Sequence, residues 1–311
     1  MNHPFGLGRI PSEPDDRDHP LDRYLSVAPL PATFTSPVVT AILDQGTTPQ
    51  CVAYSGVTGR TITEAPDAGL VAFDPHDLFA LCHGGPNGTE IRTAANVLLK
   101  TGALSTSGPG TRPGERFKIG AYAAAPSLEK IKAAVYAQGW AWLGVNWAES
   151  WFTPQRDGTL PRPDKIAGGH AISVRGWSDI RQALQIQNSW GAKWGVGGWC
   201  WLPYAYLDST PEAFATIDAP DCVVTITPYP TLRTWQVRKG QVLRGWDVKR
   251  PNVPLGPAYA WPKDSTAHAD AVLTVTWPGI SPMPMPYGTV IRVTDGAYAS
   301  QLIRLAEVTM L

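Results

Sequence analysis

The chain has 311 residues, a length that fits one large domain with a smaller one. Its 26 basic and 26 acidic residues balance and form no basic block, which argues against a nucleic-acid partner and against a polybasic membrane surface. No apolar run reaches the length of a membrane span, and no basic segment followed by an apolar core opens the chain. We therefore expect no Sec-type signal peptide, a cytoplasmic location or export by another route, and proteins or carbohydrates as partners.

The cysteines give no sign of a disulfide framework or of a metal site. There are four of them, Cys51, Cys82, Cys200 and Cys222, and no pair has zinc-ligand spacing. We expect reduced thiols, no metal and no other cofactor.

The first 29 residues are interpreted as a short polar leader. They contain prolines and a charged cluster at residues 15–19. A metal site could be imagined there, but a solvated leader that wraps the main domain fits the composition better.

A helix is predicted around the first cysteine. Thr48 can cap a helix whose first residue is Pro49, which puts Cys51 in the first turn. Unpaired backbone N–H groups and the helix dipole favour a thiolate at that point. Several residues that follow are poor helix formers, so propensity alone does not predict this helix.

Three further helices are predicted from their ends and their apolar spacing. The first begins after Asp74 and ends before Gly84, the second covers about residues 89–101, and the third follows Ser127 and ends at Gly139.

Beyond Gly139 the apolar spacing changes to a period of two. Strands are predicted over residues 140–147, 170–177, 183–187 and 198–202. Helices that precede a sheet indicate the α+β class.

Residues 203–229 are interpreted as the exit from this domain, because prolines interrupt them. The remaining segments alternate again, which predicts a small all-β module over residues 223–311. Its strands are expected at 234–237, 241–246, 271–277, 289–294 and 301–308. The module carries aromatic residues that could bind a glycan, the cell wall or a protein, or could simply build its core: Trp235, Trp246, Tyr259, Trp261, Trp277 and Tyr287.

Three short motifs point to a chemistry. Gln45 precedes Cys51 by six positions, His170 follows a pair of glycines, and Asn188 begins the sequence Asn-Ser-Trp-Gly that includes Trp190. A thiol, a histidine as its base and an amide that orients the base form the site of a cysteine acyl-transfer enzyme.

These motifs resemble those of the papain-like cysteine peptidases over about residues 30–208. The order cysteine, histidine, asparagine agrees, and the spacing is close to the roughly 130–150 residues expected of this class. The resemblance implies a two-lobed domain over residues 30–222, with a helical lobe followed by a β-barrel-like lobe.

The resemblance also implies roles for individual residues. Cys51 would be the nucleophile and would form a thiolate–imidazolium pair with His170. Asn188 would fix the imidazole ring and Trp190 would shield their hydrogen bond. Gln45 would donate its amide to the oxyanion, with the backbone N–H of Cys51 as second donor.

Three glycines are assigned less directly. Gly84 and Gly85, or Gly88 in the adjacent turn, would correspond to the glycines that pair with the backbone of the substrate in the family.

The sequence departs from the family at two points. Thr48 stands where the usual disulfide partner of Cys82 would be, so that bridge cannot form. The leader is also shorter than the inhibitory propeptide common in the family, which argues against latency by that means.

The leading function is thiol-dependent hydrolysis of peptide bonds, with a polypeptide as substrate. A peptidoglycan amidase or a transpeptidase with the same triad is an alternative, and so is a papain-like fold retained for binding or assembly. The intact triad argues against the last.

Overall fold

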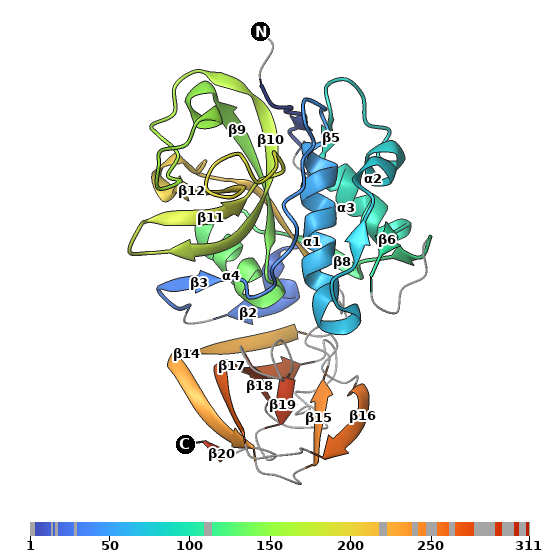
Figure 1. Cartoon of the computed structure of the whole chain (residues 1–311), viewed down its shortest axis with the longest axis vertical. Coiled ribbons are helices and arrows are strands. Elements are labelled where there is room, and N and C mark those ends of the chain that lie inside the picture. The colour runs from blue at the N-terminus through green and yellow to red at the C-terminus, as the bar shows by residue number, and fades with distance from the viewer. Residues whose placement is uncertain are drawn as a thin grey trace. The chain divides into compact units, whose positions relative to one another are not determined.

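The structure is a computed structural model (Figure 1). It describes residues 4–13, 15, 18–27, 30–108 and 114–217, and within 223–311 the backbone of the strands given below. The chain divides into two compact units, one of residues 1–21 and 32–216, the other of residues 22–31 and 217–311. The leader expected over residues 1–29 is thus shared between both units. Asp16, Arg17 and Cys222 lie outside the described residues.

The helices of the first unit agree with the predicted ones in number and position within the described residues. They are α1 (Cys51–Ala68), α2 (Pro75–Leu81), α3 (Ile91–Lys100) and α4 (Leu128–Gln138). Short 3₁₀ helices cover Leu21–Arg23, Glu149–Phe152 and Tyr204–Tyr206.

The ends of α2 and α4 follow from the sequence. Asp74 accepts hydrogen bonds from the backbone of His76 and Asp77, and Ser127 caps α4 in the same way. Gly139 ends α4 in the left-handed conformation, with φ of 79°, as predicted.

The predicted cap of α1 is wrong. The hydroxyl of Thr48 donates to the carbonyl of Gln45 at 2.7 Å, and the helix starts only after Gln50, which makes no side-chain cap. Cys51 is nevertheless in the first turn, as predicted.

Packing explains why a poor helix-forming sequence is helical in α1. A Cβ added at Gly56 would lie 2.7 Å from the ring of Trp142, and one added at Gly59 would lie 2.0 Å from the ring of Trp140. Both tryptophans are fully buried, so the two glycines let the helix approach the sheet closely.

A seven-stranded sheet forms the second lobe of this unit, beside α1 in Figure 1. Its strand order is β12-β11-β10-β9-β13-β8, and β3 pairs with β10. These strands are β3 (Thr33–Thr35), β8 (Ala121–Ala124), β9 (Ala141–Ala148), β10 (Ile166–Ser178), β11 (Ala183–Gln187), β12 (Trp199–Pro203) and β13 (Glu212–Ile217). The four strands predicted before residue 203 are confirmed.

Two small sheets complete the helical lobe. One joins β4 (Ala72–Phe73), β6 (Ala103–Ser107) and β7 (Arg116–Phe117). In the other, β1 (Arg9–Ile10) of the leader pairs in parallel with β5 (Thr89–Glu90). The helix predicted from residue 89 therefore begins two residues later, because these residues are extended.

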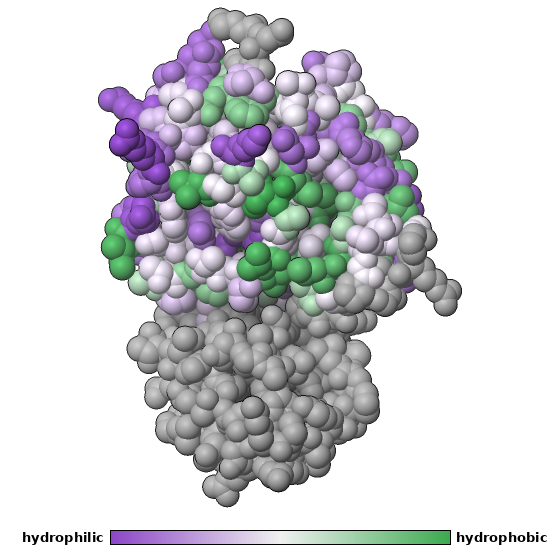
Figure 2. Space-filling model, in the orientation of Figure 1, coloured by the Kyte–Doolittle hydropathy of each residue, from purple (hydrophilic) through white to green (hydrophobic). Residues whose placement is uncertain are grey.

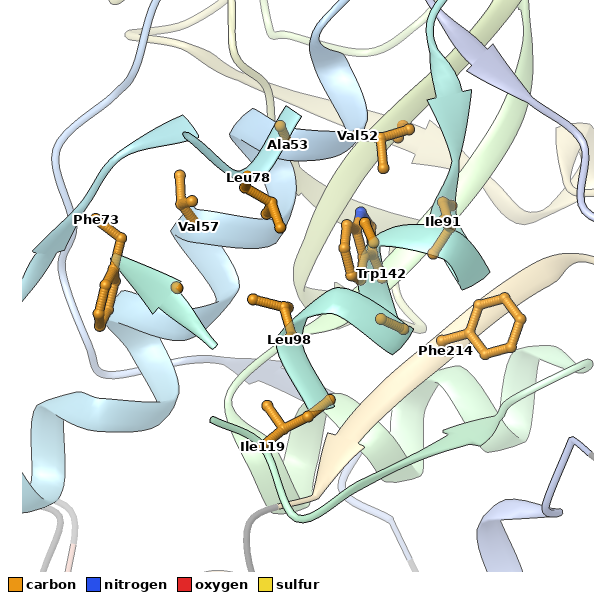
Figure 3. Close-up of a cluster of buried hydrophobic side chains, with 14 of the residues drawn as sticks. Val52, Ala53, Val57, Phe73, Leu78, Ile91, Leu98, Ile119, Trp142 and Phe214 are labelled. Atoms are coloured by element: carbon orange, nitrogen blue, oxygen red, sulfur yellow. The ribbon is translucent and has the colours of Figure 1, made fainter. Parts of the chain in front are cut away.

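The core lies between the helices and the sheet. Figure 3 shows Val52 of α1, Leu78 of α2 and Leu98 of α3 around Trp142 of β9, with Phe214 of β13 at the edge of the cluster. This contact fixes the start of α1 against the strands.

Figure 2 shows that hydrophilic and hydrophobic residues are mixed on the face of the first unit that is turned toward the viewer. Large exposed hydrophobic residues of the described part are aliphatic: Ile10, Val39, Leu70, Ile166, Ile180 and Val196. Among the described residues no helix combines the length and apolarity that crossing a bilayer would require.

The second unit contains an eight-stranded sheet of order β16-β15-β19-β18-β17-β14-β2, in which β20 pairs with β14. Its strands are β2 (Leu25–Val27), β14 (Val223–Val237), β15 (Val242–Trp246), β16 (Pro254–Ala260), β17 (Ser265–Thr276), β18 (Val290–Val293), β19 (Leu302–Arg304) and β20 (Thr309–Met310). The side chains of the aromatic residues proposed for binding lie outside the described residues.

The boundary between the two units falls within residues 203–229, but the expected interruption of regular structure there is wrong. β13 lies inside this segment and pairs with β9, and β14 starts within it. The register of β14 against β17 shifts between Pro228 and Arg233, so the prolines interrupt pairing without ending the strand.

Candidate active site

Cys51 is the first residue of α1 and is fully buried. The hydroxyl of Ser55 donates to the carbonyl of Cys51 at 2.7 Å and accepts a hydrogen bond from the indole of Trp142 at 2.7 Å. The first turn of α1 is thereby tied to β9, which holds the thiol in place.

His170 and Asn188 meet at neighbouring strands of the sheet. His170 lies on β10, Asn188 directly follows β11, and the imidazole Nε2 is 2.8 Å from the Oδ1 of Asn188. The same Oδ1 accepts the backbone N–H of Ser189 at 2.8 Å, so it is the oxygen of the amide that faces the ring. Nε2 therefore carries the proton, and Nδ1, which is buried without a partner, is free to accept one.

Aromatic rings enclose the imidazole. The ring of Trp190 stacks on His170 with centroids 4.6 Å apart, and Trp147 meets it edge-on at 5.0 Å. Both indoles are buried, so the pair of His170 and Asn188 is out of contact with water. The sequence pattern indicated Trp190; it gave no sign of Trp147.

Gln45 is oriented by three partners. Its Oε1 accepts the hydroxyl of Ser189 at 2.6 Å, while its Nε2 donates to the carbonyl of Thr48 at 2.7 Å and to the carbonyl of Gly6 at 3.2 Å. Since carbonyls only accept, the amide N–H groups face Thr48 and, in the leader, Gly6. The side chain holds a peptide carbonyl, which is the task expected of an oxyanion donor.

The leader crosses this site. Its Phe5 stacks on Trp190 with centroids 4.8 Å apart, and the indole of Trp190 donates to the carbonyl of Gly6 at 3.1 Å. The backbone N–H of Gly8 donates to the carbonyl of Gly169 at 3.0 Å, and its carbonyl accepts the N–H of Thr89 at 3.0 Å.

Although the leader is shorter than the propeptide common in the family, a few of its residues cover the site. β1 and the two leader glycines, Gly6 and Gly8, lie directly on it, and residues 1–21 belong to the first unit.

The leader covers the site in this structure, an arrangement that we call the closed state, and this burial shifts the pKa values of the reacting groups. Burial raises the pKa of Cys51 to about 12, against the lowering effect of backbone hydrogen bonds from Ala171 and Val52. Burial also lowers the pKa of His170 to about 4, opposed by its bond to Asn188. Both shifts favour the neutral form of these buried groups, and the thiolate–imidazolium pair stays a prediction.

The three assigned glycines differ in position. Gly88 faces the leader, since a Cβ on it would lie 1.6 Å from the carbonyl oxygen of Gly8, and its φ of 94° favours glycine. A Cβ on Gly84 would instead meet the ring of Phe79, and one on Gly85 would meet nothing within 4 Å. Of these three glycines, Gly88 is the one that contacts the leader.

The remaining thiols of the described part are unpaired. Cys82 and Cys200 are buried, and burial raises the pKa of both, that of Cys82 to about 12. Across residues 4–217, apart from the few that the structure leaves undescribed, no three His, Cys, Asp or Glu side chains gather into a metal-binding group.

Comparison of structures gives the fold class. Xylellain, a cysteine protease from Xylella fastidiosa, superposes with a TM-score of 0.59 at 20% identity, over 70% of this chain and 97% of that one. Procathepsin B from Trypanosoma congolense superposes with a TM-score of 0.56 at 16% identity, over 68% and 85%. The first unit thus has the fold of papain-like cysteine peptidases, and the likeness expected from the sequence is confirmed at this level.

Sequence comparison gives two relatives. A gut-specific cysteine proteinase of Caenorhabditis elegans is 23% identical over 244 residues, which cover 61% of this chain and 74% of that protein. A peptidase C1-like protein of Acanthamoeba polyphaga mimivirus is 40% identical over 40 residues, only 13% of its length. No family profile matches the chain.

Proposed function

We propose that this protein is a cysteine peptidase that hydrolyses peptide bonds through an acyl-enzyme on Cys51. The observation that carries the proposal is the arrangement around His170. Its Nε2 is hydrogen-bonded to the amide oxygen of Asn188, and its Nδ1 is buried without a partner. Ala171, the next residue of β10, forms a backbone hydrogen bond with the Cys51 thiol. A base held in one tautomer, next in the chain to the residue that hydrogen-bonds a thiol at a helix start, supports thiol activation.

The proposed reaction assigns one role to each of these groups. His170 Nδ1 takes the proton of the Cys51 thiol, and the sulfur attacks the carbonyl carbon of the peptide bond. The side-chain amide of Gln45 and the backbone N–H of Cys51 stabilise the oxyanion. The imidazolium returns its proton to the leaving amine, and a water activated by His170 then hydrolyses the thioester.

The leader has to move before a substrate can bind. The carbonyl of Gly6 already uses the amide of Gln45, and the carbonyl of Gly169 already accepts Gly8. Hydration of the opened site would lower the pKa of Cys51 and raise that of His170, because burial is the main cause of both shifts.

The test combines labelling and turnover. We expect a thiol-directed epoxide to modify the full chain at Cys51, as mapped by mass spectrometry, and Cys51→Ala to abolish both labelling and peptide hydrolysis without a large change in thermal stability. Cys82→Ala serves as control and should retain both. Hydrolysis by Cys51→Ala, or modification at Cys82 instead, contradicts the proposal.

We also propose that the strands from residue 223 onward form an all-β accessory module. Their pairing in one sheet supports it. A glycan, cell-wall or protein partner for this module stays a prediction from its aromatic residues.

A further inference from the structure

A buried guanidinium lies on the strand that carries His170. Arg175 of β10 is only 1% exposed. Its guanidinium donates to four groups that carry no charge, namely the carbonyl of Val38 and the side-chain oxygens of Ser36, Thr40 and Gln187. Burial lowers its pKa to about 10. Burial of a charge is unfavourable unless several acceptors surround it, so these bonds fix the position of Arg175.

Gln187 is the partner that leads to the candidate active site. It is the last residue of β11 and directly precedes Asn188. Its Oε1 accepts from Arg175, so its Nε2 is turned away from the cation and donates to the hydroxyl of Thr40 at 2.9 Å and to the carbonyl of Ala41 at 3.2 Å. The guanidinium thus sets the orientation of this amide.

Trp199 holds the same place from the opposite strand. It pairs with Gln187 across β11 and β12, and its ring centre lies 5.6 Å from the guanidinium carbon of Arg175. An aromatic face stabilises a cation at this distance. Because β11 lies between β10 and β12 in the sheet, its end is held from both neighbouring strands.

The other partners of Arg175 belong to the segment of residues 36–45, which ends at Gln45. The end of this segment contacts the residues that follow Asn188. The backbone N–H of Gln45 donates to the carbonyl of Ser189 at 2.9 Å, and the carbonyl of Leu43 accepts the N–H of Gly191 at 3.0 Å. Segment 36–45 therefore holds the chain on both sides of Asn188.

The side chain of Asn188 depends on this backbone. Its Oδ1 is shared between Nε2 of His170 and the backbone N–H of Ser189, each at 2.8 Å. Its buried Nδ2 has no hydrogen-bond partner among the described residues. A displacement of Gln187 would therefore move the oxygen that receives the imidazole N–H, and would weaken their bond.

We propose that Arg175 is a positioning residue for the reaction. By clamping Gln187 between β10 and segment 36–45 it fixes Asn188, and Asn188 in turn fixes the imidazole of His170 with the proton on Nε2. The inference rests on the proposed peptidase function and adds to it a residue that touches neither the substrate nor the reacting atoms.

The proton on Nε2 of His170 reports on this arrangement without turnover. In the full chain with isotope-labelled histidine, we expect a downfield proton resonance in NMR spectra for this buried, hydrogen-bonded N–H. Its loss in His170→Gln assigns it. Arg175→Met replaces the guanidinium with a neutral chain, and it should speed exchange of this proton with water by about 10-fold or more, because Asn188 then holds it less well.

Two further variants separate positioning from stability. Gln187→Met removes the link and keeps the cation, so it should reproduce the faster exchange even if Arg175→Met fails to fold. Arg60→Met is the matched control, because Arg60 is also 1% exposed and its partners lie on or beside α1, namely Thr63, Glu64 and the carbonyl of Lys118. It should lower the thermal stability yet leave the exchange rate unchanged.

Steady-state kinetics give a second readout. Arg175→Met should lower kcat by about 10-fold with little change in KM, because Arg175 is buried away from any substrate. Arg175→Lys keeps the charge without the planar fork and should restore part of kcat.

Three results would overturn the role of Arg175. They are the absence of the downfield resonance from the unsubstituted chain, an exchange rate unchanged in Arg175→Met or Gln187→Met, and an equal increase of that rate in Arg60→Met.

The two proposals fail in different ways. Faster exchange in Arg175→Met and Gln187→Met, without any peptide hydrolysis by the unsubstituted chain, would leave the hold on Asn188 standing and remove the peptidase function. Hydrolysis by the unsubstituted chain, with exchange unaffected by either substitution, would do the reverse.

Discussion

At the residue scale, the hydrogen-bond partners of Gln45 allow its side-chain amide only one orientation. Ser189 donates to its oxygen, and the carbonyls of Gly6 and Thr48 accept from its nitrogen. An amide held in this way costs no reorganisation when charge develops on a substrate oxygen.

Gln45→Ala should therefore lower kcat by about 10² to 10³, with a smaller change in KM, because the lost donor acts mainly in the transition state. Steady-state kinetics with a fluorogenic peptide check this. Gln185→Ala is the control, since Gln185 contacts Thr35 at 2.9 Å away from the site, and should leave kcat unchanged. An unchanged kcat for Gln45→Ala would remove this residue from the oxyanion site.

Some site residues could be predicted because each belongs to a short motif with a chemical meaning. Cys51, His170 and Asn188 could be predicted in this way, and so could Gln45. Trp147 could not, because only the pairing of β9 with β10 brings its ring against His170. No local pattern in the sequence encodes such a contact between distant segments.

At the scale of elements, α1 shows packing overriding propensity. Its glycines at 56 and 59 weaken an isolated helix, yet they face Trp142 and Trp140 so closely that no larger residue fits. The α2 and α4 helices were predictable because their caps lie in the sequence; α1 depends on a contact with β9 that the local sequence does not show. β13 was missed because prolines around it suggested a loop.

Gly59→Ala tests this account through the sign of its effect. Helix propensity alone would stabilise the protein by about 1 kcal/mol, whereas overpacking against Trp140 should destabilise it by about 1–3 kcal/mol. Denaturant unfolding gives the free energy difference. Gly85→Ala is the control, because a Cβ there meets nothing within 4 Å, and it should change the free energy of unfolding little. Stabilisation by Gly59→Ala would show that the close contact does not limit this position.

At the scale of the whole first unit, we expect release of the leader and protonation of His170 to be coupled. The leader is anchored beyond the site as well, since Arg92 of α3 pairs with Asp18 at 2.5 Å. The closed state buries a neutral His170, and an open state would return the imidazole to water. The position of the leader should therefore depend on pH.

The sign of this dependence follows from the pKa of His170. Burial lowers it from 6.5 to about 4 in the closed state, so the open state binds the proton more tightly. The closed state is therefore most stable relative to the open state above pH 6.5, and this stability is lost as the pH falls toward 4.

Hydrogen exchange of the Gly6 and Gly8 amides, corrected for intrinsic rates, should thus show less protection at pH 4.5 than at pH 7. His170→Gln should remove most of that difference, because the buried imidazole whose protonation opposes the closed state is then absent. Equal protection at both pH values, or an undiminished difference in His170→Gln, would mean that His170 does not control release of the leader.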